Sequence, residues 1–462
     1  MSRFDLAVLG GGPGGYVAAI RGAQLGKKVC IIDKEKLGGV CLNWGCIPTK
    51  ALIKNAEVYS LIKQADKYGV KVREVKVDFK SNVKRSRDVS DRLSKGIEFL
   101  MKKNKIKHFN GTGRLVSKNN IELKKENKTE YIETDKVIIT TGARPRTFPG
   151  IEYDGERVIS SKEAMILEVP PKDLTIIGSG AIGVEFAYYF NEFGTKVHIL
   201  EMMDRILPNE DQDVSKEVEK HFEISGIKVS KGVKVSKIEG MKTKAKVYVK
   251  KNKSEEIIEA DKVLLAAGVI GNIENIGLKS IGIETESGSI KTDQFNKTNI
   301  DNIYAIGDVT GPPWLAHVAS AQGHVAVEHA FGFGATPIDY LNIPGCIYCQ
   351  PQVGSLGMTE EQAIESGYDI QVGKFLFQAS GKAMAVGDTR GFVKLIFDKR
   401  YGELIGAHIV GSEATEMIAE LGMAKALETT WDDIAMTMHA HPTLSEAIME
   451  AALDAQGFSI HQ

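Results

Sequence analysis

Two cysteines, Cys41 and Cys46, lie close together in the stretch GGVCLNWGCIPTKAL, and thiols at this spacing could carry redox chemistry. The chain has five cysteines in 462 residues, which is too few for a disulfide scaffold. In a reducing compartment, a close pair of thiols is more often catalytic or metal-binding than structural. This pair follows one dinucleotide-binding motif and precedes a second, so the order predicts a dithiol that exchanges electrons with two redox cofactors.

Zinc is the alternative partner for the cysteines. Structural zinc sites join two pairs of ligands, and Cys41 and Cys46 have no second ligand pair beside them in the sequence. Cys346 and Cys349, in PGCIYCQPQVG, do have C-x-x-C spacing. We interpret these two as buried small residues on a strand, with a second dithiol or a metal site as the alternative. We therefore expect no resident metal ion.

The five-residue step from Cys41 to Cys46 does not suit a disulfide in a regular helix. Helix geometry would place the two Cα atoms about 8 to 9 Å apart, whereas bridged cysteines lie within about 7 Å of each other. Gly45 and Pro48 are suited to a distortion, so we predict a non-ideal turn between the cysteines. On a helix that continues through Pro48, Lys50 would share the face of Cys46 and bring a positive charge to that sulfur.

A dinucleotide-binding unit precedes the cysteines. The stretch FDLAVLGGGPGGYVAAIRGAQLGKKVCIID reads as strand, glycine turn, helix and strand. Gly10, Gly12 and Gly15 have the G-x-G-x-x-G spacing that turns the chain tightly and directs a helix N-terminus at a pyrophosphate. Asp33 ends the second strand 18 residues after Gly15, where a carboxylate can accept hydrogen bonds from a ribose diol. In this context the motif predicts nucleotide binding rather than a structural glycine turn.

A second unit repeats the first at a constant offset of 168 residues. In LTIIGSGAIGVEFAYYFNEFGTKVHILE, the glycine positions are held by Gly178, Gly180 and Gly183, and Glu201 ends the second strand. A carboxylate there repels a 2′-phosphate and favours NAD over NADP, since NADP sites usually carry an arginine. Arg205 lies close enough along the chain to leave NADP open.

Each unit is followed by an apolar strand that ends in a small-residue turn. These turns run from Thr141 to Pro145 and from Ala267 to Asn272, and they resemble the paired turns that close the nucleotide domains of two-dinucleotide flavoproteins. A third strand ends in Gly307 and Asp308, where a carboxylate could reach a polyol; a simple turn opened by aspartate is the alternative. Because the first unit lies beside the cysteines, we expect it to hold the flavin that they reduce.

With these motifs in view, the chain resembles the pyridine nucleotide-disulphide oxidoreductase family over about residues 3 to 455. The motifs that carry the resemblance are the redox stretch at residues 38 to 52, both glycine motifs, the Asp308 motif, and HAHPTLSE at residues 439 to 446. Their form is that of the members that oxidise protein-bound dihydrolipoamide with NAD. Glutathione reductases share the plan, but their redox stretch and C-terminal motif read differently.

The resemblance implies roles for the dithiol and its neighbours. Cys41 is expected to exchange with the substrate, and Cys46 to lie against the flavin of FAD. Lys50 is expected at the flavin ring, where it would pair with Glu185. Chemistry requires two differently placed thiols, whereas the assignment of the two roles comes from the family.

Acid–base chemistry is expected from the C-terminal motif, because histidine is the side chain that titrates near neutral pH. The resemblance makes His441 the base and Glu446 the acid that orients it. Thr443 to Glu446 also reads as a capping box that opens the helix SEAIMEAALDA, which is the structural alternative for Glu446. His439 and His317 are other candidates for a base, although the family does not assign them that task. The family's base comes from the partner subunit, so the resemblance implies a homodimer with shared active sites.

The cofactor sites follow from the glycine motifs and from the resemblance. For FAD we expect Gly10, Gly12, Gly15, Asp33, Lys50, Gly113, Thr141, Gly142, Asp308 and Ala316. For NAD we expect Gly178, Gly180, Gly183, Glu201, Val235 and Gly268.

Three positions depart from the family pattern. Trp44 stands between the cysteines where relatives have a small aliphatic residue, so it could reshape the dithiol channel. Asp33 is one carbon shorter than the usual glutamate, and Glu35 could share the ribose contact. The turn GVIGN, which begins at Gly268, lacks the arginine and proline of many relatives.

Composition describes an ordinary multidomain chain, with 26% charged residues, 43% hydrophobic residues and a formal charge of -1. Nucleic acid is therefore not an expected partner. Apolar runs stay well below the roughly 18 to 20 residues of a membrane span, and the chain enters a strand at Phe4 with no signal-peptide layout. We expect a cytoplasmic protein without membrane attachment.

We predict an α/β fold with two duplicated Rossmann-like dinucleotide-binding domains and a C-terminal α+β dimerisation domain. Residues 1–148 would bind FAD, residues 149–270 would bind NAD, residues 271–340 would complete the FAD site, and residues 341–462 would form the interface. Since no lipoyl domain precedes Phe4, the substrate arm should come from lipoyl-bearing proteins of 2-oxo acid dehydrogenase or glycine cleavage complexes.

Other functions are possible on the same core. An NADPH-dependent reductase of glutathione or another small disulfide would use the same dithiol, and Glu201 argues against it. A mercuric-ion reductase would need a C-terminal cysteine pair, which the tail DAQGFSIHQ lacks. A nucleotide-binding redox sensor without turnover is a third alternative, and the complete set of dithiol, lysine, histidine and glutamate argues against it.

Overall fold

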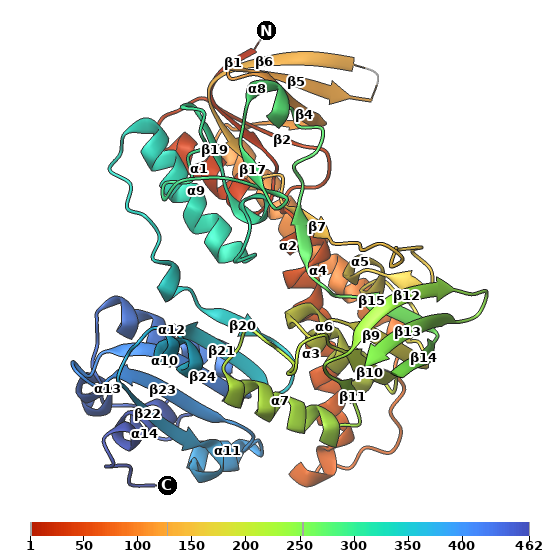
Figure 1. The fold of residues 1–462 in the computed structure, drawn as a ribbon, viewed down its shortest axis with the longest axis vertical. Coiled ribbons are helices and arrows are strands. Elements are labelled where there is room, and N and C mark those ends of the chain that lie inside the picture. The colour runs from red at the N-terminus through yellow and green to blue at the C-terminus, as the bar shows by residue number, and fades with distance from the viewer. Residues whose placement is uncertain (1, 127, 252–253, 462) are drawn as a thin grey trace.

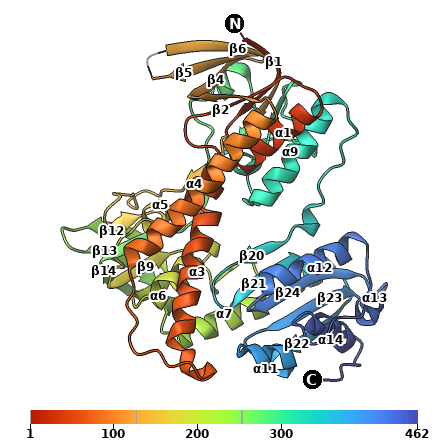
Figure 2. The same ribbon diagram turned by 180° about the vertical axis from the view of Figure 1, so that it is seen from behind.

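The computed structural model describes residues 2–126, 128–251 and 254–461. The chain forms three bodies, each built on its own sheet (Figures 1 and 2). The first body lies at one end of the molecule, and the second and third bodies lie at the other end. Two long helices, α3 (Cys46–Lys63) and α4 (Phe79–Lys103), pack together and extend from the first body along the second.

The first sheet has seven strands in the order β3-β2-β1-β6-β5-β4, with β19 also paired to β6. Its strands are β1 (Ser2–Leu9), β2 (Val29–Asp33), β3 (Lys107–Asn110), β4 (Thr112–Ser117), β5 (Asn120–Lys125), β6 (Lys128–Ile139) and β19 (Ile303–Ala305). Strands β1, β2, β3, β6 and β19 are parallel. The ends of β1 and β6 and most of β2 are buried apolar runs, as expected where both faces of a parallel sheet are covered. Because β19 pairs in parallel with β6, the residues that follow β19 lie at the same end of the sheet as those that follow β1, β2 and β6, although they are far away in the sequence.

The second sheet is parallel, with the order β11-β10-β9-β15-β8. Its strands are β8 (Val158–Ile159), β9 (Asp173–Ile177), β10 (Lys196–Leu200), β11 (Lys228–Ser230) and β15 (Lys262–Leu265). A separate antiparallel sheet accompanies it, formed by β12 (Lys234–Gly240), β13 (Ala245–Lys251) and β14 (Ser254–Ala260). Helix α7 (Gln212–Ile224) joins β10 to β11 and contacts the third body.

The two glycine motifs form the same local structure. Helices α1 (Pro13–Gln24) and α6 (Ala181–Glu192) both have 12 residues. Their N-cap residues are Gly12, with φ −70° and ψ −175°, and Gly180, with φ −70° and ψ −177°. The duplicated fold predicted from the constant sequence offset is therefore confirmed.

The third sheet is antiparallel, with the order β20-β21-β24-β23-β22. Its strands are β20 (Gly345–Ile347), β21 (Gln352–Gly357), β22 (Ile370–Leu376), β23 (Phe392–Asp398) and β24 (Leu404–Gly411). Helices α12 (Ala414–Ala426), α13 (Trp431–Met436) and α14 (Glu446–Ala455) share one apolar core with it. The predicted α/β fold class with a C-terminal α+β domain is confirmed.

Short elements connect the bodies. Strands β7 (Ala143–Pro145) and β16 (Val269–Gly271) pair in antiparallel fashion, so the turns that follow the two units cross side by side. Helix α9 (Ala316–Phe331) packs against α1 in the first body. The remaining elements are α2 (Gly39–Trp44), α5 (Ser161–Ala164), α8 (Leu278–Ile281), α10 (Glu360–Glu365), α11 (Gly381–Val386), β17 (Thr285–Glu286), β18 (Ser289–Ile290) and the 3₁₀ turns η1 (Ala65–Tyr68), η2 (Gly307–Thr310), η3 (Tyr340–Asn342) and η4 (Phe377–Ala379).

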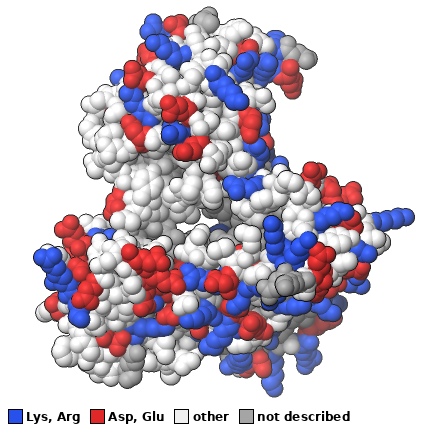
Figure 3. All heavy atoms as spheres, in the orientation of Figure 1, with Lys and Arg blue, Asp and Glu red and all other residues white. Residues whose placement is uncertain are grey.

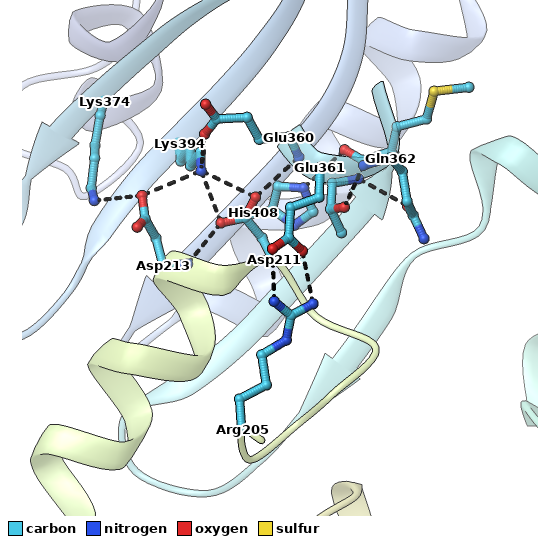
Figure 4. A network of polar contacts seen from close by, with 11 residues as sticks. Arg205, Asp211, Asp213, Glu360, Glu361, Gln362, Lys374, Lys394 and His408 are labelled. Carbon is cyan, nitrogen blue, oxygen red and sulfur yellow. Dashed lines mark hydrogen bonds and ion pairs between the residues drawn. The ribbon is translucent and has the colours of Figure 1, made fainter. Parts of the chain in front are cut away.

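A buried charge network fastens α7 to the third sheet (Figure 4). Lys394 on β23 has a side chain only 3% exposed, and its Nζ lies 2.9 Å from Asp211, 2.7 Å from Glu360 and 3.2 Å from Asp213. Asp211 is itself the N-cap of α7 and accepts a hydrogen bond from Asp213 N at 2.9 Å. The network therefore fixes the second body against the third.

No helix in the described part of the chain is both long enough and apolar enough to cross a membrane. Charged side chains cover much of the surface. In Figure 3 they are sparse in the region where the first body, at the top, faces the third body, at the lower left.

Candidate functional site

The two cysteines lie on either side of a helix break. Cys41 belongs to α2 and Cys46 begins α3, and Gly45 between these helices has φ −145° and ψ −111°. The predicted non-ideal turn is confirmed. Both cysteines are free thiols, Cys41 half-buried and Cys46 exposed, and the two side chains are hydrogen-bonded to each other.

The electrostatics separate the two sulfurs. The hydrogen bond from Cys41 and the charge of the Lys50 ammonium together lower the pKa of Cys46 to about 7, against the opposing effect of its partial desolvation. The same hydrogen bond and burial raise the pKa of Cys41. Cys46 is therefore the thiol that ionises first, which makes it the better leaving group of a disulfide formed by the pair.

Lys50 lies one helical turn after Cys46 and forms a two-point ion pair with Glu185 on α6. Its Nζ lies 2.9 and 2.8 Å from the two carboxylate oxygens. Glu185 is 4% exposed and also accepts a hydrogen bond from Tyr348 N at 3.0 Å. The Lys50 ammonium stands 4.5 Å from the centre of the Tyr348 ring. All three bodies thus meet beside the dithiol, and Tyr348 is a contact that sequence reasoning missed.

The Trp44 side chain, at the end of α2, contacts two positively charged side chains. Lys162 Nζ lies 4.5 Å from the centre of the indole, and the Arg87 guanidinium carbon lies 4.8 Å from it. Arg87 also donates to the carbonyl of Asn43 at 2.6 Å, and the Asn43 amide donates to Gly39 O at 3.0 Å. Two cations from α4 and α5 therefore hold the C-terminal end of α2. Neither Arg87 nor Lys162 carries a local sequence signal for this role.

The three glycines of the first motif differ in the space around them. A Cβ on Gly10, whose φ is +112°, would lie 2.1 Å from Thr140 O, and a Cβ on Gly15 would lie 2.0 Å from Gly10 O. A Cβ on Gly12 would meet its nearest atom at 3.8 Å. The outer glycines thus permit the tight turn and close packing, while Gly12 opens the N-terminus of α1 to a ligand.

The second motif repeats this division of roles. A Cβ on Gly178 would lie 2.6 Å from Ala266 O, and a Cβ on Gly183 would lie 2.1 Å from Gly178 O. A Cβ on Gly180 would meet nothing within 4 Å. The residues of both motifs therefore fit the pyrophosphate of a dinucleotide at the N-terminus of a helix.

An acid closes each motif. Asp33 accepts hydrogen bonds from Gly11 N at 2.5 Å and from Glu35 N at 2.7 Å. Glu201 accepts from Ser179 N at 2.9 Å and from Ser179 Oγ at 2.6 Å. In both units the acid at the strand end is thus held by the residue between the first two glycines. The side chain of Glu35 is exposed, and its backbone rather than its carboxylate contacts Asp33.

The other residues expected at the flavin surround the first sheet. Asp308 lies in η2 after β19, burial raises its pKa, and its charge acts on Cys41. Ala316 opens α9. Thr141 and Asn272 exchange two hydrogen bonds, Thr141 Oγ1 donating to Asn272 O at 2.8 Å and Asn272 Nδ2 to Thr141 O at 2.9 Å. Gly113 lies in β4, where a Cβ would lie 2.7 Å from Leu9 Cδ2, so its lack of a side chain serves core packing.

The other residues expected at the nicotinamide nucleotide lie in the second body or beside it. Gly268 occupies a position equivalent to that of Gly142, which is expected at the flavin; each lies one residue before one of the crossing strands β7 and β16. Val235 is on β12 and packs, half-buried, in the same apolar cluster as Ala267. Gly268 and Val235 thus lie near the end of the second sheet at which Glu201 is found.

His441 and Glu446 form a hydrogen-bonded pair in the third body. His441 Nδ1 lies 2.8 Å from Glu446 Oε1, and Glu446 Oε2 accepts from Thr443 N at 2.8 Å. One carboxylate thus serves both the imidazole and the backbone, and these contacts keep the pKa of Glu446 below its usual value. The expected capping box is only half present, because α14 begins at Glu446 and the Thr443 hydroxyl donates to Ala440 O instead.

The structure does not bring His441 to the dithiol within one chain. The helices that flank it, α13 and α14, lie in the third body away from α2 and α3 (Figures 1 and 2). His441 is 79% exposed at its side chain. His439, the neighbouring alternative, has a side chain that is only 4% exposed, with Nε2 2.7 Å from Glu420 and Nδ1 2.8 Å from Thr437 O. His317 lies on α9, where burial lowers its pKa.

The expectation that Cys346 and Cys349 are both buried on a strand is wrong in part, because Cys346 is on β20 but only half-buried, whereas Cys349 is buried but follows the strand. The two cysteines pack against different cores. Cys346 lies against the apolar core of the third body, and its Sγ is 3.9 Å from Thr415 O. Cys349 is fully buried with the core residues of the second body, and its Sγ is 3.3 Å from Pro351 O. Burial raises the pKa of both thiols. Within the described residues, no group of three or more histidine, cysteine or acidic side chains could hold a metal ion.

A dithiol placed between two dinucleotide-binding units defines a class of enzyme, the disulfide oxidoreductases that exchange electrons with a nicotinamide coenzyme through a flavin. Residues 4–323 match the family model described as pyridine nucleotide-disulphide oxidoreductase, and residues 343–452 match its dimerisation domain. The chain belongs to the pyridine nucleotide-disulphide oxidoreductase family. Its cofactors are FAD and NAD.

The chain is similar to several named proteins and solved structures over nearly its whole length. It is 45% identical over 456 residues to dihydrolipoyl dehydrogenase from Chlorobaculum parvum, covering 98% of this chain and 97% of that one. It is 43% identical over 471 residues to dihydrolipoyl dehydrogenase from Bacillus subtilis, covering 100% and 99%. The crystal structure of LpdA from Mycobacterium tuberculosis has a TM-score of 0.91 at 26% identity, covering 98% and 99%. A copper(II) complex of the HOCl-induced flavoprotein disulfide reductase RclA from Escherichia coli has a TM-score of 0.88 at 27% identity, with the same coverage.

Proposed function

We propose that this chain oxidises protein-bound dihydrolipoyl groups to lipoyl groups with NAD as the final acceptor. The observation that carries the proposal is the environment of Cys46, which is hydrogen-bonded to its partner thiol Cys41 and is subject to the charges of the Lys50–Glu185 ion pair. Full-length similarity to dihydrolipoyl dehydrogenases supports the choice of substrate.

The reaction begins at the base. Glu446 is bonded to His441 Nδ1, so Nε2 remains free to take a proton from the incoming dithiol. The substrate thiolate then attacks Cys41 in the Cys41–Cys46 disulfide, a mixed disulfide forms, and Cys46 leaves as a thiolate. Attack at Cys41 follows from the lowered pKa of Cys46, because the sulfur with the lower pKa is the better leaving group.

The second half of the exchange releases the product. The remaining substrate thiol loses its proton and displaces Cys41, so the substrate becomes a disulfide and the enzyme a dithiol. FAD held by the first glycine motif would accept the two electrons of this dithiol, and NAD held by the second would take them up as a hydride, so that the Cys41–Cys46 disulfide is restored. Lys50 holds a positive charge beside the Cys46 thiolate, and Glu185 fixes the position of that charge.

The first unit takes FAD and the second takes NAD. Support for this order comes from Asp308, which follows β19 of the first sheet and whose negative charge contributes to the raised pKa of Cys41. In the second unit, Glu201 presents a carboxylate to a ribose diol and opposes a 2′-phosphate. The corresponding domains are residues 1–148 and 149–270, with residues 271–340 completing the FAD site and residues 341–462 forming the interface.

The active enzyme is a homodimer in which His441 of one chain serves the dithiol of the other. Support comes from the match to a dimerisation domain and from exposed apolar side chains beside His441. Met436 is 86% exposed and Met438 is 95% exposed, and apolar side chains so placed favour a partner surface. The substrates are lipoyl-bearing proteins of 2-oxo acid dehydrogenase or glycine cleavage complexes in the cytoplasm.

The test is a comparison of two reactions on one FAD-loaded preparation. NAD-dependent oxidation of dihydrolipoamide is measured beside NADPH-dependent reduction of oxidised glutathione, with Cys46→Ser as the inactive variant and Cys349→Ser as the matched control. We expect strong NAD activity that is lost only in Cys46→Ser. Activity with NADPH and glutathione alone would overturn the proposal, and a yellow but inert protein would favour a redox sensor.

A further inference from the structure

The loop that follows Glu201 carries one positive charge among several negative ones. Its sequence from Glu201 to Asp211 is EMMDRILPNED, in which Arg205 is the sole lysine or arginine. An arginine near this strand end is the residue that accommodates the 2′-phosphate of NADP in related folds. The sequence alone therefore leaves both coenzymes open, and the position of the Arg205 side chain decides between them.

Arg205 is held by the third body (Figure 4). Its Nη1 lies 2.8 Å from Glu361 Oε1 and its Nη2 lies 2.7 Å from Glu361 Oε2. Two parallel charge-assisted hydrogen bonds of this kind fix the plane of the guanidinium as well as its position. The pair raises the pKa of Arg205 and lowers that of Glu361, so both groups stay charged.

The helix that carries Glu361 is itself fixed against the loop. Thr359 caps α10 in a reciprocal capping box with Gln362. Glu360 N donates to Asp211 Oδ2 at 3.1 Å, and the Glu360 carboxylate lies 2.7 Å from the buried Lys394 ammonium. The first turn of α10 is thus docked on the end of the same loop, which keeps Glu361 opposite Arg205.

The negative charge at the strand end is fixed as well. Glu201 Oε2 accepts from Ser179 N and Oγ at 2.9 and 2.6 Å, and Oε1 accepts from Met203 N at 2.8 Å. A 2′-phosphate placed here would meet a fixed carboxylate, while the cation that could compensate it is engaged elsewhere.

We propose that Glu361 is a specificity-determining residue for the coenzyme, because it holds Arg205 in a two-point ion pair across the boundary between the second and third bodies and so withholds that cation from a 2′-phosphate. This inference rests on the proposed use of NAD. The third body then takes part in coenzyme selection, in addition to the repulsion of a 2′-phosphate by Glu201 in the second body.

The test measures binding rather than turnover. ADP-ribose and 2′-phospho-ADP-ribose lack the nicotinamide, so their affinities for the FAD-loaded dimer can be measured by calorimetry without reaction. We expect Glu361→Gln to tighten binding of 2′-phospho-ADP-ribose by roughly three- to tenfold and to leave ADP-ribose unchanged. The double variant Arg205→Ala with Glu361→Gln should lose that gain.

Two further variants serve as controls. Glu365→Gln removes an exposed carboxylate from the last position of the same helix and leaves the Glu360 and Glu361 contacts intact, so it should leave the ratio of the two affinities unchanged. Arg205→Ala alone should also leave this ratio unchanged, because a sequestered arginine contributes nothing to a 2′-phosphate. If Arg205→Ala weakens binding of the phosphorylated probe, the arginine is already available and the proposal fails, even where Glu361→Gln does not fold.

Other results would contradict either the role of Glu361 or the preference for NAD. An unchanged ratio in a Glu361→Gln protein that still binds ADP-ribose overturns the role of Glu361 and leaves NAD use intact. An equal gain in Glu365→Gln, or a gain that persists without Arg205, assigns the effect to a general change of charge or packing in this helix and also overturns the role of Glu361. Tighter binding of 2′-phospho-ADP-ribose than of ADP-ribose by the unmodified protein would overturn NAD preference itself.

Discussion

Lys50 and Glu185 form a two-point ion pair, with Nζ–O distances of 2.9 and 2.8 Å, that joins the helix of the dithiol to the helix of the second glycine motif. The residues are 135 positions apart in the sequence. The pair sets two opposing charges beside Cys46, because the ammonium lowers the pKa of that thiol and the carboxylate raises it. The reactivity of Cys46 therefore depends on contacts between separate bodies of the molecule.

Removing the two charges should move Cys46 in opposite directions. We expect Lys50→Met to raise the pKa of Cys46 above its value of about 7, and Glu185→Gln to lower it. The measurement is the rate of iodoacetamide alkylation of Cys46 in the reduced, FAD-loaded protein as a function of pH, followed by peptide mass spectrometry. Lys54→Met, on the same helix but paired with Glu57 at 2.9 Å, is the control. Shifts of the same sign in both variants would refute this account.

Replacing Glu446 by glutamine should reduce turnover without disturbing the fold. A glutamine can still accept from Thr443 N, but it removes the negative charge beside His441 Nδ1. We expect kcat/KM for dihydrolipoamide to fall by roughly 10- to 100-fold in Glu446→Gln, and by about 10²- to 10⁴-fold in His441→Gln. Glu420→Gln, which contacts His439 at 2.7 Å instead, should keep full activity. Equal losses in Glu420→Gln and Glu446→Gln would assign the effect to general disruption of this region.

Several features of the site could be read from the sequence because they are local. The spacing of Gly178, Gly180 and Gly183 determines one turn, and an i to i+5 cysteine pair cannot be bridged in a regular helix. The contacts of Tyr348 and of Glu361 could not be read in this way, because they lie 163 and 156 residues from their partners Glu185 and Arg205. These contacts form only when the third body packs against the second, and no local sequence pattern predicts that packing.

The glycines of the second motif should respond differently to the same substitution. A Cβ on Gly180 meets nothing within 4 Å, so Gly180→Ala should fold normally and lose ADP-ribose binding, because the methyl group occupies the path of the pyrophosphate. A Cβ on Gly183 would lie 2.1 Å from Gly178 O, so Gly183→Ala should lower the thermal midpoint of the protein. Calorimetric binding and thermal unfolding on both variants distinguish the two effects. Normal ADP-ribose affinity in Gly180→Ala would show that the second unit does not bind the nucleotide in this manner.

Trp44 should contribute stability through its two cations. Each cation–π contact of this kind is worth about 0.5–1 kcal/mol at a partly exposed site, and the indole is packed against a buried core. We expect Lys162→Met to lower the free energy of unfolding by about 0.5–1 kcal/mol, and Arg87→Met to lower it by more, because Arg87 also bonds Asn43 O. In a Trp44→Leu background the Lys162→Met change should cost nothing further. Additive losses would show that Lys162 acts elsewhere.

The buried Lys394 network should be the most costly to break. Lys394→Met leaves Asp211, 1% exposed, without its cation, so we expect the free energy of unfolding to fall by about 3–5 kcal/mol. Lys374→Met removes a lysine that pairs with Asp213 at 3.0 Å near the surface, and should cost less than about 1 kcal/mol.

The pH dependence gives an independent check of the same network. Burial favours the neutral form of Asp211, but His408 and Lys394 together hold its pKa below the ordinary value. A carboxyl with a lowered folded pKa stabilises the protein above its unfolded pKa of about 4 and loses that contribution as the pH falls through the folded value. Thermal midpoints measured from neutral pH down to about pH 3 should therefore fall more steeply for the unmodified chain than for Lys394→Met. Parallel curves for the two proteins would mean that Lys394 does not stabilise the ionised form of Asp211.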